Sequence, residues 1–284
     1  MSVPAVLSIA GSDSGGGAGI QADLKAFARC GVHGMTAITA LTAQSTMGVS
    51  GVYPVAGEFI VEQVRTVAED IGVDAVKIGM LGTAETVFAV KEALGHIGDD
   101  VPIVIDPVMV SESGAVLLDD AARAAIVTEL LPLATVITPN LPEARVLASG
   151  ARSGVEAWRC VSEGDDIEDL ARALHALGPD CVVVTGGHRE AVVDVFFDGS
   201  VVELLAGERH PDGAAHGSGC THSSSIAAHL ALGFTPLEAA RVAREIASEA
   251  VRDGHREIGG GAGPVNALGV GVRGRTAGGA PRPA

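Results

Sequence analysis

Short runs of apolar residues alternate with longer amphipathic segments along most of the chain. Within the segment 58–70, for example, Phe59, Val61, Val64 and Val67 fall on or near one face of a helix. The pattern predicts strands at residues 6–10, 35–41, 74–78, 102–105, 135–138 and 181–185. It predicts helices at residues 20–30, 58–70, 85–94, 120–131, 143–147, 167–177, 221–232 and 236–252.

This alternation is typical of an α/β fold, in which helices cover both faces of a mostly parallel sheet. Asp198-Gly199 separates two further apolar runs, Val192–Phe197 and Val201–Leu205, and predicts an antiparallel hairpin at the sheet edge. We expect one domain over residues 1–268, with a surface insertion at 152–165. Residues 269–284 are rich in Gly, Pro and Arg, and we expect a tail without fixed structure.

Chemically distinctive residues follow the predicted strands. Because ligands bind at the carboxyl ends of strands in such sheets, these residues predict one shared cleft. They are Gly11–Asp23, Gln44, and the segments 77–80, 106–108, 138–143 and 185–188.

Composition limits the class of partner. Apolar residues make up 47 % of the 284 residues, enough to bury a sizeable core. The 19 Lys and Arg against 35 Asp and Glu give a net charge of −16. Such a surface repels nucleic acids and anionic membranes, so we expect neither as a partner. An anionic substrate would have to be held by local dipoles or a metal ion.

The cysteines and the apolar runs bear on the cellular location. The four cysteines (Cys30, Cys160, Cys181 and Cys220) form no C-x-x-C pair, which argues against a zinc ribbon or a thioredoxin-type site. The chain has no secretory signal pattern and no apolar stretch long enough to span a bilayer. We therefore expect a cytoplasmic protein with free thiols.

Three motifs suggest other functions but are incomplete. Gly17-x-Gly19-x-x-Ala22 matches a loose dinucleotide fingerprint, yet after Asp23 the next acidic residue is Glu58, too distant to bind a ribose. An NAD-dependent dehydrogenase is therefore a distant alternative. A tight glycine turn would explain the same residues.

The other two motifs lack partners in the sequence. The string Ser12–Gly16 is like a serine-protease loop, but no matching His or buried Asp can be assigned. His216, His222 and His229 lack the close spacing of zinc ligands, so we expect partly buried or solvated histidines.

The segment His216–Thr221 (HGSGCT), just before a predicted helix, is the strongest candidate for phosphoryl chemistry. Its two glycines, Gly217 and Gly219, allow backbone N–H groups to converge, and the helix N-terminus adds positive potential. Cys220 falls in the first turn, where the pKa of a thiol tends to be lowered, so it could act as a base or a polarisable group. A glycine-permitted loop with an inert cysteine is the alternative interpretation.

Oxygen-bearing side chains suggest a magnesium site. Asn140 and Glu143 stand three residues apart at a strand-to-helix junction, and Asp106 ends a neighbouring strand. Magnesium takes one or two carboxylates and keeps most of its waters, which suits this set. Asn140 could equally be a helix N-cap, and both roles can hold together. Gln44 could bind the edge of a heterocycle, or be a turn amide, and Met80 could be a core filler.

Taken together, these strings resemble the hydroxymethylpyrimidine/phosphomethylpyrimidine kinases of thiamine biosynthesis, members of the ribokinase superfamily. The resemblance covers nearly the whole chain in the family's order. The matching segments are 9–24, 38–44, 77–81, 106–109, 138–144, 186–188, 216–221 and 263–266.

The resemblance implies an ATP- and Mg²⁺-dependent enzyme that phosphorylates an aminopyrimidine alcohol and then its monophosphate. It also implies a ribokinase-like fold and a homodimer. It implies pyrimidine contacts from Gly11, Asp23, Gln44, Met80 and Val108. The catalytic anion hole would be Gly217, Ser218, Gly219 and Cys220, the magnesium set Asp106, Asn140 and Glu143, and the ATP contacts Thr185 and Gly187.

Two departures from the family pattern and two alternatives remain. One departure is the insertion at 152–165, which lies near the nucleotide side by sequence order. Family members often carry Lys where this chain has Thr185, and the loss of that cation would weaken nucleotide binding. A pyridoxal or pyridoxine kinase is the nearest alternative, because a related pocket can accept a pyridine alcohol. A non-catalytic pyrimidine sensor is another, although mere binding would need neither the magnesium set nor the anion hole.

Overall fold

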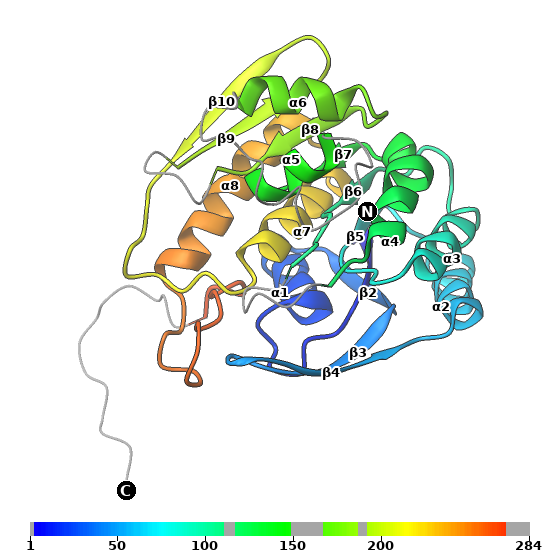
Figure 1. The fold of residues 1–284 in the computed structure, drawn as a ribbon, viewed down its shortest axis with the longest axis horizontal. Coiled ribbons are helices and arrows are strands. Elements are labelled where there is room, and N and C mark those ends of the chain that lie inside the picture. Colours follow the sequence, from blue (N-terminus) through cyan, green and yellow to red (C-terminus); the bar gives the residue numbers. More distant parts are fainter. Residues whose placement is uncertain (1–2, 111–116, 149–166, 187–191, 271–284) are drawn as a thin grey trace, which may run out of the picture.

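The computed structural model describes residues 3–110, 117–148, 167–186 and 192–270 (Figure 1). The predicted insertion at 152–165, Gly187 and nearly all of the predicted tail fall outside these residues. No helix in the described ranges is both long and apolar enough to cross a membrane.

An eight-stranded sheet forms the centre of the molecule, in the order β10-β9-β8-β7-β6-β5-β1-β2. The strands from β2 to β8 in this order run parallel, and β9 and β10 pair antiparallel at the edge, as the sequence predicted. All residues of β1 are buried, as expected for a strand covered on both faces. The strands are β1 (Ala5–Ala10), β2 (His33–Ile38), β5 (Ala75–Ile78), β6 (Ile103–Ile105), β7 (Val136–Ile137), β8 (Cys181–Val184), β9 (Val192–Phe197) and β10 (Val202–Gly207).

Helices cover the two faces of this sheet because successive strand residues point to opposite sides. On one side Val6 and Val104 pack with Phe27 and Ile226, which belong to α1 (Gly19–Cys30) and α7 (Ser218–Ala231). Helix α8 (Pro236–Arg252) completes this layer. The opposite layer contains α2 (Gly57–Asp70), α3 (Ala84–Leu94), α4 (Asp120–Ala125), α5 (Leu141–Ala148) and α6 (Ile167–His175).

Two predicted elements differ from those observed. The helix expected over 120–131 is α4, which passes into a π-helical turn (Ile126–Leu130) and a short 3₁₀ turn (Leu131–Leu133). The single strand expected over 35–41 is divided between two strands. Its first part belongs to β2, and the chain leaves the central sheet at Thr39. It then forms a separate antiparallel hairpin of β3 (Ala40–Ser45) and β4 (Gly48–Pro54), which the apolar pattern does not predict (Figure 1).

The segment after α8 returns to the loop before α7. Val265 donates its backbone N–H to the carbonyl oxygen of His216 at 3.0 Å, and Asn266 donates to Ala250 at 2.9 Å. Residues 263–266 therefore fix the loop that carries His216.

Candidate active site

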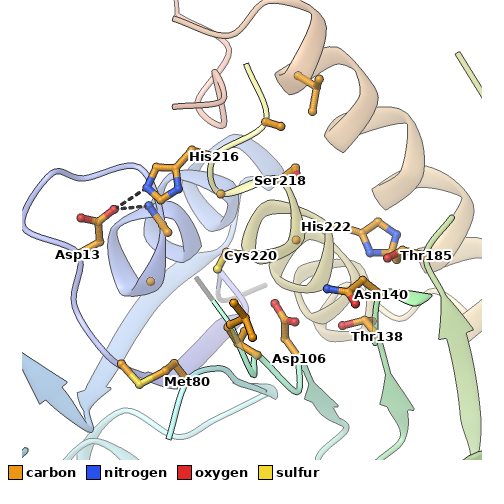
Figure 2. Close-up of a pocket in the computed structure, with 18 of the residues that line it drawn as sticks. Asp13, Met80, Asp106, Thr138, Asn140, Thr185, His216, Ser218, Cys220 and His222 are labelled. Carbon is orange, nitrogen blue, oxygen red and sulfur yellow. Dashed lines mark hydrogen bonds and ion pairs between the residues drawn. The ribbon is translucent and has the colours of Figure 1, made fainter. Parts of the chain in front are cut away.

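A cavity of about 540 Å³ lies at the carboxyl ends of the parallel strands, a size typical of small-ligand sites (Figure 2). The structure brings most of the candidate residues together around it. Those lining it are Gly11, Gln44, Met80, Asp106, Val108, Asn140, Glu143, Thr185, Gly217, Ser218, Gly219 and Cys220.

Asp23 is the exception among the described candidates. Its side chain is fully buried and does not line the cavity. It accepts hydrogen bonds from Ser8, Ser224 and Lys77, the last at 2.9 Å. The expectation that Asp23 contacts the pyrimidine directly is therefore corrected: Asp23 is the counter-ion of Lys77, a residue in one of the segments expected at the cleft.

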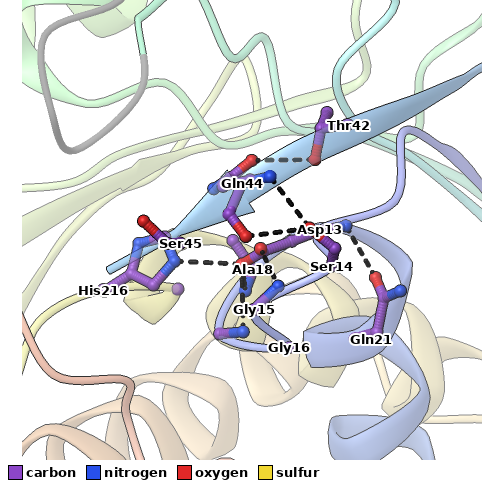
Figure 3. A network of polar contacts seen from close by, with 12 residues as sticks. Asp13, Ser14, Gly15, Gly16, Ala18, Gln21, Thr42, Gln44, Ser45 and His216 are labelled. Atoms are coloured by element: carbon purple, nitrogen blue, oxygen red, sulfur yellow. Dashed lines mark hydrogen bonds and ion pairs between the residues drawn. The ribbon is translucent and has the colours of Figure 1, made fainter. Parts of the chain in front are cut away.

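The glycine-rich loop after β1 is organised around the carboxylate of Asp13 (Figure 3). Asp13 accepts backbone N–H groups from Gly15 at 2.8 Å, Gly17 at 3.0 Å and Ala18 at 2.8 Å. Burial raises its pKa, but hydrogen bonds from His216 and from the amides of Ala18 and Gly15 bring it below the ordinary value. Amides that a dinucleotide would need for its pyrophosphate are thus already bound to an internal anion, which argues against the dehydrogenase alternative.

Glycine at position 217 is required by the contact between the two loops. Gly217 has a φ of 87°, and a Cβ there would lie only 1.8 Å from the carbonyl oxygen of Gly17. The residues that follow form the first turn of α7, whose N–H groups have no acceptor within the helix. Gly219 and Cys220 line the cavity at this turn. Helix N-termini favour bound anions in general, and in this turn the N–H of Ser218 donates to the carbonyl oxygen of Ala215 at 3.0 Å.

Lys77 brings a positive charge to the same place. Its side chain is 0 % exposed, and it lines the inner wall of the cavity. Burial lowers the pKa of its ammonium group, but the carboxylates of Asp23 and Asp106 more than reverse this, so Lys77 stays charged. Lys77 and the start of α7 both contribute positive potential here, against the negative charges of Asp23 and Asp106.

The thiol of Cys220 does not behave as the sequence suggested. Burial raises its pKa to about 12, and Asp23 and Asp106 act in the same direction, against the lowering effect of Lys77. The expectation of a lowered thiol pKa is therefore wrong, because loss of hydration outweighs the helix N-terminus and the lysine. At neutral pH the group is a thiol, not a thiolate.

The acidic residues lie on the wall formed by β6 and α5. The N–H of Glu143 donates to the side chain of Asn140, and the Glu143 carboxylate accepts the N–H of Asn140, both at 2.9 Å, so Asn140 caps α5. Burial and the neighbouring Asp106 raise the pKa of Glu143 to about 8. Burial also raises the pKa of Asp106, which accepts a hydrogen bond from Ser223 at 3.0 Å.

The two ends of the cavity differ in chemistry. At one end Met80 lies over Gly11, where a Cβ would come within 2.4 Å of the methionine methyl, and Gln44 extends from β3. At the other end lie Thr185 and His222, and Cys220 and Asp106 stand between the two ends (Figure 2).

Comparisons with known proteins agree with this architecture. A family model described as phosphomethylpyrimidine kinase matches residues 13–266. The hydroxymethylpyrimidine/phosphomethylpyrimidine kinase of Rhizobium meliloti is 45 % identical over 263 residues, which cover 92 % of this chain and 95 % of that protein. The chain belongs to the phosphomethylpyrimidine kinase family, and its fold is ribokinase-like.

Two solved structures extend the comparison. The pyridoxal kinase of Staphylococcus aureus in complex with AMP-PCP and pyridoxal has a TM-score of 0.81 at 32 % identity, covering 96 % of each chain. The phosphomethylpyrimidine kinase of Clostridium difficile has a TM-score of 0.73 at 37 % identity, covering 87 % of this chain and 99 % of that one. The chain is thus a phosphotransferase that uses ATP and acts on a small molecule.

Proposed function

We propose that the chain transfers the γ-phosphoryl group of ATP to 4-amino-5-hydroxymethyl-2-methylpyrimidine and then to the resulting monophosphate, a step of thiamine biosynthesis. The observation that carries this proposal is the glycine-framed start of α7, Gly217–Cys220, which lines one cavity between its Gln44 end and its Thr185 end. We propose it as the anion site for the transferred phosphoryl group. The names of the curated relatives support the choice of substrate.

The Gln44 end suits an aminopyrimidine. The Gln44 amide can both donate to a ring nitrogen and accept from an exocyclic amine. Met80 and Val108 offer apolar surface to the ring, and the absence of a side chain at Gly11 makes room for the Met80 methyl group. The hydroxymethyl group would then face Cys220 and the start of α7.

The transfer itself is an in-line displacement. The substrate oxygen forms a bond to the γ-phosphorus, the bond from that phosphorus to the bridging oxygen breaks, ADP leaves, and the hydroxyl proton is released. Such reactions depend mostly on positioning and on stabilising charge. We assign those tasks to the backbone of Gly217, Ser218 and Gly219 and to the cation of Lys77. Cys220 contributes a neutral, polarisable contact, because its thiol is protonated.

The acidic wall fits a magnesium ion. Asp106 and Glu143 are two buried carboxylates, Asp106 raises the pKa of Glu143, and a cation between them would relieve this repulsion. We propose that Asp106 and Glu143 would hold the ion, while Asn140 orients Glu143 by capping α5. Magnesium would supply charge neutralisation at the phosphates. Among the described residues, no cluster of three or more His, Cys, Asp or Glu side chains is placed to hold a metal ion.

The remaining expectations concern the nucleotide, the assembly and the location. We propose Thr185 as an ATP contact because it lines the end of the cavity away from Gln44. Gly187 stays a sequence-based proposal, as do a homodimer and a cytoplasmic location. Light scattering on the purified protein tests the dimer.

A pyridoxal kinase activity is the second candidate, supported by the likeness to the Staphylococcus aureus enzyme. The test is a comparison of kcat/KM for the aminopyrimidine alcohol and for pyridoxal with Mg-ATP. We expect the pyrimidine to be preferred. A preference for pyridoxal would contradict the proposal, and binding of the pyrimidine without ATP turnover would indicate a sensor.

A further inference from the structure

A histidine at the end of the cavity away from Gln44 has no role in the chemistry described so far. His222 lies on α7, and its side chain lines the cavity although the residue is only 4 % exposed. Neither ring nitrogen has a hydrogen-bond partner in the part of the chain that the structure describes. In Figure 2 the ring extends from α7 on the side of Thr185 and Asn140, away from Asp13 and Met80.

The charged groups near His222 are already paired with each other. Asp194 on β9 accepts the N–H of Gly186 at 2.9 Å and forms an ion pair with Nε of Arg244 on α8 at 3.2 Å. Burial and Arg244 lower the pKa of His222, and Asp194 opposes them only in part. The imidazole is therefore neutral at physiological pH and offers one donor and one acceptor.

A buried polar side chain without a partner is uncommon in folded proteins, because burial removes its hydrogen bonds to water. A leucine of similar volume at position 222 would fill the same space without that penalty. The other buried histidine on this helix, His229, is satisfied: its Nδ1 lies 2.7 Å from the carbonyl oxygen of Ser225. An unsatisfied imidazole on a ligand cavity indicates that the ligand supplies the partner.

The position of His222 indicates which part of the ligand its imidazole would contact. The proposed anion site of Gly217–Cys220 lies between the Gln44 end and the His222 end, so the phosphoryl donor extends toward His222 if the alcohol occupies the Gln44 end. A phosphate would use only the donor of a neutral imidazole, because phosphate oxygens accept. A nucleobase edge or a ribose hydroxyl can use both nitrogens.

Resting on the proposed function, we propose that His222 binds the nucleoside part of the phosphoryl donor and thereby positions the γ-phosphate. His222 is a positioning residue in this scheme, distant from the reacting atoms. The prediction concerns nucleotide affinity more than the rate of the chemical step.

The test uses His222→Leu, with His222→Asn as the conservative variant and His229→Leu as a matched buried control on the same helix. We expect His222→Leu to raise the Kd and the KM for Mg-ATP about tenfold, the effect of losing a buried hydrogen-bond partner. The Kd for the pyrimidine and kcat at saturating ATP should change far less. His222→Asn should lie between wild type and His222→Leu, and His229→Leu should leave the KM for ATP unchanged.

A second readout separates this role from a structural one. We expect His222→Leu to raise the thermal stability of the nucleotide-free protein while reducing the stabilisation that added Mg-ATP gives. The relative affinities for ATP, GTP and 2′-deoxy-ATP should differ between wild type and His222→Leu, because the variant loses a contact to the base or to a ribose hydroxyl.

Two results would overturn the proposal. One is an unchanged affinity of folded His222→Leu for Mg-ATP. The other is an equal loss of affinity for inorganic tripolyphosphate, which would move the contact to the phosphates. A wild-type protein that binds Mg-ATP through His222 but does not phosphorylate the pyrimidine would contradict the proposed function and leave this inference standing.

Discussion

Nε2 of His216 lies 3.0 Å from Oδ2 of Asp13, although the two residues are 203 positions apart in the chain. This contact joins the glycine-rich loop after β1 to the loop that begins α7 (Figure 3). The same carboxylate accepts three backbone N–H groups from its own loop. The two loops that bound the middle of the cavity therefore act as one unit.

His216→Ala tests this coupling. We expect the free energy of unfolding to fall by about 1–3 kcal/mol, because a buried carboxylate loses a hydrogen bond. We also expect kcat/KM to fall, because the start of α7 is no longer held against the first loop. Denaturant unfolding and steady-state kinetics measure the two effects. The control is His33→Ala, an exposed position on β2, and a His216 variant indistinguishable from that control would contradict the coupling.

The Lys77–Asp23 pair provides a second test, because both side chains are 0 % exposed. Removing one member of a buried ion pair leaves an uncompensated charge and costs about 3–5 kcal/mol. We expect Lys77→Met to lose about that much stability, and Lys77→Met with Asp23→Asn to recover a large part of it. Urea unfolding of both single variants and the double variant gives the coupling energy. Additive losses would show that the pair is not an interacting unit.

Cys220 should react slowly with thiol reagents at neutral pH. With a pKa of about 12 against an ordinary 9.0, its thiolate is about a thousandfold scarcer than that of an unperturbed cysteine. Iodoacetamide labelling followed by peptide mass spectrometry measures the rate, with a model thiol peptide as reference. We expect Cys220→Ser to retain activity within about tenfold, because a base is not required of this group. Rapid labelling of Cys220 near pH 7 would restore the thiolate interpretation.

Glu143 should make stability depend on pH. Its pKa of about 8 in the folded protein lies above the ordinary 4.5, so the folded state binds the extra proton between those values. The stability from this protonation is complete below about pH 4.5 and is lost as the pH rises through about 8. Glu143→Gln removes this dependence, so its stability relative to wild type should increase as the pH rises.

Thermal unfolding of wild type and Glu143→Gln between about pH 5.5 and 8.5 measures this difference. The matched control is Glu129→Gln, since Lys91 holds the pKa of that carboxylate below its ordinary value. This control should show no such trend. A constant difference between wild type and Glu143→Gln across the range would contradict the raised pKa.

The inner strands of the central sheet, such as β1, β5 and β8, were predictable because they are buried on both faces and are nearly continuous apolar runs. The hairpin of β3 and β4 was not, because β4 is mostly exposed and carries no alternation of buried and exposed residues. The predicted strand over 35–41 merged β2 with the start of β3, since nothing at Thr39 marks a change of sheet. Gln44 was nevertheless assigned to the site, through its place at a strand end and the resemblance.

The site residues were predictable as a group but not in their charge states. Spacing near a helix start suggested a reactive Cys220, yet the burial that raises its pKa comes from segments distant in sequence. The resemblance implies that Asp23 contacts the substrate, and its ion pair from α1 to Lys77 on β5 is visible only in three dimensions. For His222 the sequence predicts only a partly buried or solvated histidine, because a missing hydrogen-bond partner is visible only in three dimensions.

The most direct measurement is chromatographic separation of the products formed from the aminopyrimidine alcohol, Mg-ATP and the wild-type protein. We expect the monophosphate to appear first and the pyrophosphate to follow, with ADP released at each step and no product without divalent metal. We expect Asp106→Asn to retain the fold and lose most of this turnover. Absence of any phosphorylated pyrimidine from a folded wild-type protein that binds Mg-ATP would contradict the proposed function.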